Sequence, residues 1–306
     1  MSHRRRFVFA LVLALALSAC GSSDDGASGS AAGAATGAGQ TGAGGDLGLG
    51  GASSSAGSGS GAEVCDGIDN DGNGVIDDLD VGNDGVCDCL RIATLGVVGT
   101  WGRGDVFTAW LDARSDKGAV DLNDQVLTQA LLDPFQVVVA QDLSKMKRTY
   151  APEEVAALEA WVQAGGGFMT LIGYDDPSEL PNANTLLGAF GMSYDSVQIL
   201  QKGGGSTVPV TQWVPHPVTQ GVKLLGVDNG YPVQGAGTLL ASEQGYELLH
   251  AEEVGAGHVL AWGDEWITYD SEWNTHPEYQ VEGFWLNAIK WLTPSKDCQV
   301  PLPEPK

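Results

Sequence analysis

The chain has 306 residues, a length that suits one large domain with additional segments. Only 15 Lys and Arg residues stand against 39 Asp and Glu residues, so the formal net charge is −24 at pH 7. A chain this acidic repels nucleic acid and anionic lipid surfaces, and we therefore expect no nucleic-acid partner. The charge favours solubility outside the cytoplasm and leaves many carboxylates available for cations.

Residues 1–19 have the pattern of an export signal. Arg4–Arg6 form a basic start, and the apolar stretch Phe7–Leu17 is too short to span a bilayer. This composition predicts a targeting segment that is removed from the mature protein. The alternatives are an ordinary secretory peptide cut after Ala19, or an apolar helix that stays buried in the fold.

The residues that follow this segment point to lipidation. Leu17-Ser-Ala-Cys20 resembles the lipobox of bacterial lipoproteins, and the resemblance implies that Cys20 becomes the acylated first residue. Gly21, where some lipoproteins have Asp, resembles the outer-membrane sorting signal of Gram-negative lipoproteins. Several acyl chains hold a protein firmly where one would not. We therefore expect a cell-envelope protein whose membrane partner is the outer membrane, on its periplasmic or surface face.

Residues 20–62 contain the acylated cysteine and a tract of Gly, Ser, Ala and Thr that has no Lys or Arg. Such a tract cannot bury enough apolar surface to offset the entropy of ordering it, so it is predicted to be a flexible linker. A linker of this length reaches roughly 35 Å on average, which would hold the folded part clear of the lipid headgroups.

Residues 63–89 are rich in Asp and contain a predicted calcium loop between positions 69 and 80. Its spacing resembles the twelve-residue loops of dockerin and EF-hand proteins, which place oxygen ligands at positions 1, 3, 5, 7, 9 and 12 and a glycine at position 6. Gly74 occupies that sixth position. Hard oxygen ligands at this spacing favour Ca²⁺, although the loop ends in Asp instead of Glu. The predicted ligands are Asp69, Asp71, Asn73, the Val75 carbonyl, Asp77 and Asp80, and the residues that could extend or replace them are Asp66, Asn83, Asp84 and Asp88. The alternative is a solvated acidic turn without an ion.

Four cysteines remain after Cys20, namely Cys65, Cys87, Cys89 and Cys298. An even number in an exported protein indicates disulfides, and a Cys87–Cys89 bridge would be badly strained. Two connectivities are left. We favour Cys65 with Cys87 and Cys89 with Cys298; the four cysteines could also form a zinc site, which an oxidising compartment disfavours.

Residues 90–297 read as one α/β domain, followed by a short tail at 298–306. The stretch 150–176 shows the repeating unit. Pro152 suits the first turn of a helix, and the apolar residues Val155, Leu158 and Trp161 recur at helical spacing before three glycines. The apolar run Phe168–Ile172 that follows is typical of a strand buried on both faces.

The rest of the domain repeats this alternation. We expect further strands at Leu90–Val98, Phe135–Ala140, Thr238–Ala241, Tyr246–Leu249 and Gly257–Trp262. We expect further helices at Val106–Ala113, Asp124–Leu132, Asn182–Gly191 and Tyr279–Leu292. Helices alternating with apolar strands predict a doubly wound, mostly parallel, flavodoxin-like sheet.

Several pieces of this domain together resemble the class I glutamine amidotransferase-like superfamily, nearest its ThuA-like members. They are the strand at 135–140, the PEEVAALEAWVQAGGG helix, the HPVTQG stretch from His216, GAGHVLAWGDEW and the closing FWLNAIKWL helix. The resemblance implies the fold. Active amidotransferases carry a cysteine nucleophile, whereas this chain has no cysteine between Leu90 and Asp297 and no G-x-S-x-G elbow. We therefore expect a domain without thiol or serine catalysis, and we lean toward a non-enzyme.

Other chemistry is conceivable at the carboxyl ends of the strands, where open α/β sheets bind ligands. The candidate catalytic residues there are Asp175, Asp264 and Glu265, which could serve a carboxylate-dependent hydrolase or isomerase acting on carbohydrate. We expect instead that these acids are solvated and lie apart, with Trp266 covering the core. Among the histidines, His258 is predicted to pack along a strand, and His276 is exposed without a clear partner.

The sequence thus predicts a lipid-anchored envelope protein with a calcium-binding loop and a non-catalytic domain that recognises a ligand or partner, such as an envelope glycan or protein.

Overall fold

The computed structural model of the chain describes residues 61–99, 102–143, 149–173, 179–204 and 206–293. All of them belong to one compact unit, Ser55–Lys306. The predicted signal peptide, Cys20, all but the end of the linker, Asp175 and Cys298 lie outside the described residues. Among the described helices, none has both the length and the apolar character needed to cross a bilayer.

The core of the unit is an eight-stranded sheet in the order β2-β1-β3-β4-β12-β11-β10-β7. The strands from β2 to β12 are parallel, and the last three strands add an antiparallel edge. The parallel part has the flavodoxin-like order, which confirms the predicted doubly wound, mostly parallel α/β fold. The parallel strands are β1 (Ile92–Gly96), β2 (Val120–Asp121), β3 (Val137–Gln141), β4 (Gly167–Leu171) and β12 (Gly257–Trp262), and the antiparallel ones are β7 (Gln212–Trp213), β10 (Thr238–Glu243) and β11 (Tyr246–Val254).

The central strands β3 and β4 are buried at every position and almost entirely apolar, because both faces of the sheet are covered there, whereas both residues of the edge strand β2 are exposed. Val137 and Val139 of β3 belong to one hydrophobic cluster, whereas Val138 and Ala140 belong to the other. Successive side chains of a strand point to opposite faces, so a strand between two helical layers needs apolar residues at every position.

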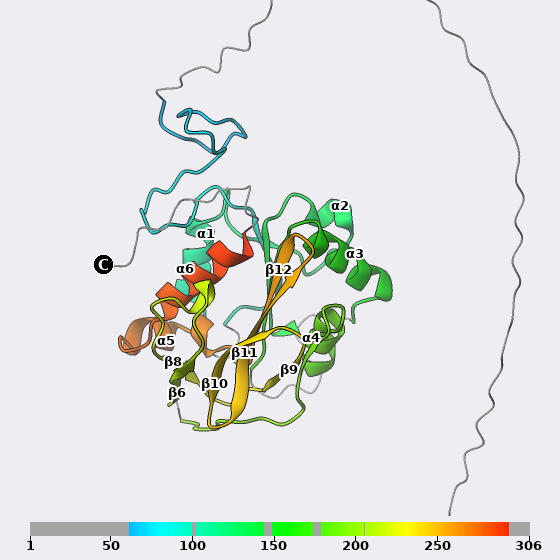
Figure 1. Cartoon of the computed structure of the whole chain (residues 1–306), viewed down its shortest axis with the longest axis vertical. Helices are drawn as coiled ribbons and strands as arrows, with labels where there is room; N and C mark the ends of the chain where they lie inside the picture. The colour runs from blue at the N-terminus through cyan, green and yellow to red at the C-terminus, as the bar shows by residue number, and fades with distance from the viewer. Residues whose placement is uncertain (1–60, 100–101, 144–148, 174–178, 205, 294–306) are drawn as a thin grey trace, which may run out of the picture. The chain divides into compact units, whose positions relative to one another are not determined.

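Helices form a layer on each face of the sheet (Figure 1). Buried residues of α1 (Asp105–Ala113) and α6 (Val281–Leu292) belong to the first cluster. Those of α2 (Gln129–Leu132), α3 (Pro152–Gln163) and α4 (Glu179–Gly188) belong to the second. The aromatic side chains of α1 and α6 meet directly, since the rings of Phe107 and Trp285 lie 4.3 Å apart.

The unit built around α3 forms as its sequence predicts. Pro152 is the first helical residue, and the Glu154 side chain accepts a hydrogen bond from the Ala151 amide at 3.0 Å. That carboxylate caps an otherwise unpaired amide at the start of the helix. Leu158 and Trp161 are buried against the sheet, and β4 begins at Gly167, the third of the glycines.

The predicted helix at 124–132 was too long, because only Gln129–Leu132 is helical. Thr128 is the N-cap, and its side-chain oxygen accepts a hydrogen bond from the Leu131 amide. The Leu127 amide donates to Glu154 Oε1 at 3.0 Å, so the backbone just before α2 is hydrogen-bonded to the first turn of α3 and does not continue the helix. The remaining elements all follow β4 in the chain and are β5 (Met192–Tyr194), β6 (Val208–Val210), η2 (Pro217–Thr219), β8 (Leu225–Val227), β9 (Val233–Gly235), η3 (Trp266–Thr268) and α5 (Asp270–Thr275).

Candidate functional site

The predicted calcium loop is a series of tight turns held by its own carboxylates. Asp69 Oδ1 accepts hydrogen bonds from the amides of Gly72 and Asn73, and Asp69 Oδ2 accepts one from Gly74 at 2.9 Å. Asp71 Oδ1 accepts from the Asn73 amide at 2.9 Å. These bonds turn the first half of the loop around its acidic side chains.

The carboxylates that come together are only partly the predicted ones. Oxygen atoms of Glu63, Asp71 and Asp78 all lie within 4.8 Å of one another. Of these, only Asp71 was predicted as a ligand. Glu63 was missed because it precedes the twelve-residue window, and Asp78 was missed because the loop pattern assigns no ligand to its position.

Two other predicted ligands lie outside this group of three carboxylates and accept backbone amides of the same segment. Asp77 Oδ1 accepts hydrogen bonds from the amides of Asp66 and Gly67, both at 2.9 Å. Asp80 accepts from the amides of Asp84 and Gly85 at 3.1 and 2.9 Å, which makes it the centre of a second turn. In this arrangement the two side chains shape the backbone of the segment.

The disulfide that we favoured from the sequence is wrong. Cys65 is bonded to Cys89, with a Cα–Cα distance of 5.3 Å. Cys87 is also disulfide-bonded. Of the two connectivities left open by the sequence, the remaining one pairs Cys87 with Cys298, which lies outside the described residues. The Cys65–Cys89 bridge ties the start of the acidic segment to its end, just before β1.

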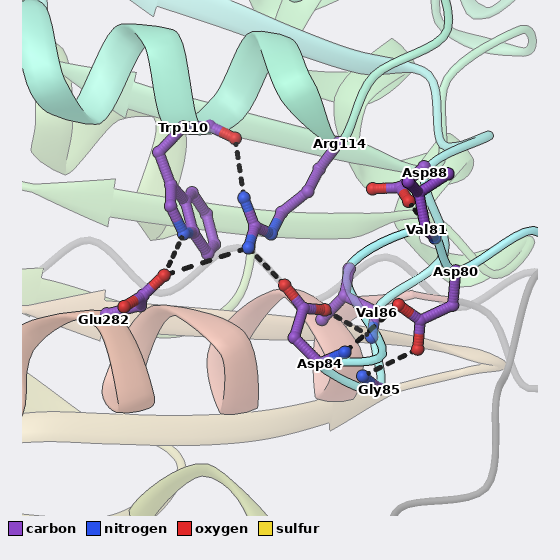
Figure 2. A network of polar contacts seen from close by, with 9 residues as sticks. All are labelled: Asp80, Val81, Asp84, Gly85, Val86, Asp88, Trp110, Arg114 and Glu282. Carbon is purple, nitrogen blue, oxygen red and sulfur yellow. Dashed lines mark hydrogen bonds and ion pairs between the residues drawn. The ribbon is translucent and has the colours of Figure 1, made fainter.

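The second acidic turn contacts the helical layer through Arg114 (Figure 2). The guanidinium pairs with Asp84, lies 3.9 Å from the centre of the Trp110 ring and donates to the Trp110 carbonyl at 3.1 Å. Glu282 of α6 is 3.9 Å from the same guanidinium and accepts from Trp110 Nε1 at 3.2 Å. Arg114 is only 9% exposed, so the segment is attached to α1 and α6 by a largely buried cation.

A second polar cluster lies at the carboxyl end of the parallel strands. Gln141, the last residue of β3, donates from Nε2 to Glu265 Oε2 at 3.1 Å and to Thr268 Oγ1 at 2.9 Å. The Tyr269 hydroxyl donates to Glu265 Oε1. A Cβ atom on Gly173 would come within 2.2 Å of the Glu265 side chain, so Glu265 packs closely against the end of β4.

Asp264 and Glu265 are not solvated, contrary to our expectation, because they are 0% and 1% exposed. Asp264 accepts hydrogen bonds from the amides of Asp228 and Trp266 at 2.9 and 2.6 Å. Burial raises the pKa of Asp264 well above its ordinary value, and the negative charges of Glu265 and Asp228 raise the pKa further. Asp175, the third candidate acid, lies outside the described residues.

Two of the histidines, His258 and His276, contact neighbouring side chains. His258 stacks on Trp291 with ring centres 4.2 Å apart, as predicted for a packing residue, and burial lowers its pKa. His276, for which we expected no clear partner, lies 3.0 Å from Glu278 Oε1 through its Nδ1 atom.

Chemically, the described residues contain one group of carboxylates suited to a hard cation and one buried acidic cluster at the strand ends. Ca²⁺ takes six to eight oxygen ligands and tolerates irregular geometry, so Glu63, Asp71 and Asp78 could hold it with backbone carbonyls and water. The strand-end cluster consists of buried, hydrogen-bonded acids, and the pKa of one of them, Asp264, is raised. Such a cluster suits either a structural role or acid–base chemistry.

The chain matches no protein-family model, and no curated protein sequence matches it. It is similar to the solved structure of the cytoplasmic protein STM1381 from Salmonella typhimurium LT2, with 15% identity and a TM-score of 0.49 over 67% of this chain and 100% of that chain. For a putative ThuA-like protein from Bacteroides uniformis the identity is 12% and the TM-score 0.41, over 66% of this chain and 91% of that chain. For the exo-beta-1,4-mannosidase Op5Man5 from an Opitutaceae bacterium they are 13% and 0.40, over 68% of this chain and 36% of that chain. Similarities this distant carry no functional argument, and the fold assignment rests on the strand order.

Proposed function

We propose that this chain is a lipid-anchored protein of the cell envelope whose acidic segment binds Ca²⁺ and whose α/β domain recognises a glycan or protein ligand without catalysis. The Leu-Ser-Ala-Cys20 sequence supports the anchor, and the Gly- and Ser-rich tract after it supports a flexible link to the folded part. The observation that carries the calcium assignment is the convergence of Glu63, Asp71 and Asp78.

Electrostatics favour a cation at this convergence. Three carboxylates within 4.8 Å of one another repel, and a divalent cation relieves that repulsion. Glu63 is held in place because Oε2 accepts from the amides of Asn70 and Asp71, and Oε1 accepts from Asp77, each at 3.1 Å. A carboxylate that is already oriented loses less freedom when it binds an ion.

Calcium titration calorimetry on purified protein tests this proposal. Asp69→Ala combined with Asp71→Ala removes two of the ligands predicted from the loop pattern, one of which also belongs to the carboxylate group, and is expected to abolish calcium uptake. A second pair of variants separates the two ligand sets. If the carboxylate group seen in the structure is the site, Glu63→Gln weakens binding and Asp80→Asn does not; a twelve-residue loop geometry predicts the reverse.

Asp124→Asn, which changes an exposed acid outside the segment, is the matched control. Equal calcium uptake by the wild type and the Asp69/Asp71 double variant would refute the calcium assignment.

The recognition role is supported by how the strand-end acids are used. Both oxygens of Asp264 accept backbone amides, and Glu265 is held by Gln141 and Tyr269. Acids that make such hydrogen bonds stabilise the end of the sheet. With no cysteine between Leu90 and Asp297, a non-catalytic domain needs the fewest assumptions.

Two observations favour the alternative of a carboxylate-dependent hydrolase or isomerase acting on carbohydrate. Asp264 has a raised pKa, as a general acid requires, and Gln141 Oε1 has no hydrogen-bond partner within the described ranges. Turnover of a panel of glycosides by the wild type, lost in Asp264→Asn, would establish this activity. Binding of a glycan without turnover would favour recognition.

A further inference from the structure

A cavity of about 510 Å³ lies beside the antiparallel part of the sheet. Its lining comes from three places in the chain: the segment after β5, the strand β9, and the turn between β10 and β11 with the start of β11. The strands β9, β10 and β11 lie close together in Figure 1. The volume falls within the range of roughly 300–1,000 Å³ that is typical of small-ligand sites.

The turn between β10 and β11 presents an aromatic ring at this cavity. Glu243 pairs with Tyr246, so only Gln244 and Gly245 form the turn, and both have positive φ, at 52° and 85°. Two central residues of this conformation are typical of a tight type I′ hairpin, which fixes where the next residue lies. Tyr246 is 42% exposed, and no other aromatic residue in the described ranges is as exposed. An open aromatic ring beside a cavity offers a face for a stacking ligand.

The polar side chains that line the cavity are already held in place. Gln234 Nε2 donates to Asp195 Oδ2 at 2.7 Å, which joins β9 to the end of β5. His250 lies 2.8 Å from Glu247 Oε2 through Nε2, and 3.1 Å from the Ala236 carbonyl oxygen through Nδ1. Each carboxylate keeps further lone pairs, so the cavity offers oriented hydrogen-bond acceptors that need little reordering when a ligand binds.

The contacts of His250 balance one of the two negative charges at the cavity. A carbonyl oxygen and an ionised carboxylate can only accept hydrogen bonds, so both ring nitrogens carry hydrogen and the ring is positively charged. His250 is 3% exposed, and this buried cation faces Glu247. The cavity therefore differs from the three converging carboxylates of the acidic segment, because it has acceptors with little excess charge. The net charge of −24 also disfavours an anionic ligand.

We propose that this cavity binds a neutral carbohydrate, with one sugar ring stacked on Tyr246 and sugar hydroxyls donating to Asp195 and Glu247. A sugar ring has apolar C–H faces and a rim of hydroxyl groups, so it matches an aromatic ring beside oriented acceptors. Val197, which is 60% exposed, adds apolar surface to the same cavity. The inference rests on the proposed recognition role, and it gives that role a ligand class and a place.

The test is a titration of the full-length protein with tetrasaccharides of glucose, galactose and mannose, followed by saturation-transfer NMR. The wild type is expected to bind at least one of them, and to bind the tetrasaccharides of chitosan and polygalacturonate, which are cationic and anionic, more weakly. Tyr246→Ala and Glu247→Gln are each expected to weaken binding roughly tenfold, because a stacking face or a charged acceptor is lost. Tyr246→Phe keeps the ring and is expected to retain binding.

Glu278→Gln is the matched control, because Glu278 also contacts a histidine, His276, but does not line the cavity. Circular dichroism confirms that each variant is folded. Binding that is unchanged in both Tyr246→Ala and Glu247→Gln overturns the site and leaves the recognition role in place. Binding of none of the neutral tetrasaccharides, or of chitosan alone, overturns the ligand class. The recognition role fails on a different result, the turnover of glycosides that is lost in Asp264→Asn.

Discussion

Replacing Arg114 with Met should loosen the attachment of the acidic segment to the α/β domain. Methionine retains most of the apolar stem but removes the guanidinium, which pairs with Asp84 and lies 3.9 Å from the centre of the Trp110 ring (Figure 2). The Arg114 and Asp84 side chains are 11% and 22% exposed, so the ion pair is partly shielded from water.

The magnitude follows from three contacts. A desolvated cation over a tryptophan ring contributes about 1–2 kcal/mol, and the hydrogen bond to the Trp110 carbonyl about 1 kcal/mol. The ion pair adds about 1 kcal/mol, because Asp84 can be partly rehydrated when its partner is removed. Since neighbouring contacts are not additive, we expect a loss of about 2–3 kcal/mol in the free energy of unfolding.

Urea denaturation monitored by tryptophan fluorescence measures this loss, which corresponds to a midpoint shift of about 1 M. Arg103→Met is the matched control: Arg103 also pairs with an acid, Asp105, but its side chain is 78% exposed, and its loss should leave the midpoint unchanged. A midpoint for Arg114→Met equal to that of Arg103→Met would show that the buried cation does not hold the segment, and the reasoning would be refuted.

Three other outcomes are expected. Cys20→Ala should move the protein from the membrane fraction to the soluble periplasmic fraction, and retention in the membrane pellet would contradict lipid anchoring. The raised pKa of Asp264 means that the native state keeps a proton that the unfolded chain releases above pH 3.8, so the free energy of unfolding should fall as pH rises above about 4. Asp264→Asn should make that slope shallower, and identical slopes in urea melts would count against the buried acid. Gly96→Ala should cost about 3 kcal/mol or more, because φ is +85° and the new Cβ would lie 1.7 Å from the Gln141 carbonyl oxygen; Gly188→Ala, which has open space, is its control, and equal melting temperatures would refute the argument.

Local chemistry was enough to predict much of the fold. Pro152, the helical spacing of Leu158 and Trp161, and the glycines after them specify where α3 begins and ends, because capping and periodicity act over a few residues. The apolar runs at β3 and β4 likewise indicate a sheet covered on both faces, because successive side chains of a strand point to opposite faces. Where a distant residue takes part, the prediction failed, as at 124–132, where Glu154 binds the Leu127 amide.

The candidate sites depend on contacts that no spacing along the chain can encode. Glu63 reaches Asp71 and Asp78 only because the segment folds back on itself. Cys65 meets Cys89 instead of Cys87 for a related reason: which sulfur is within reach depends on how the turns between them pack. The sequence by itself determined which residues can bind ions and form strands and helices, whereas long-range packing decided which of them meet and which are buried.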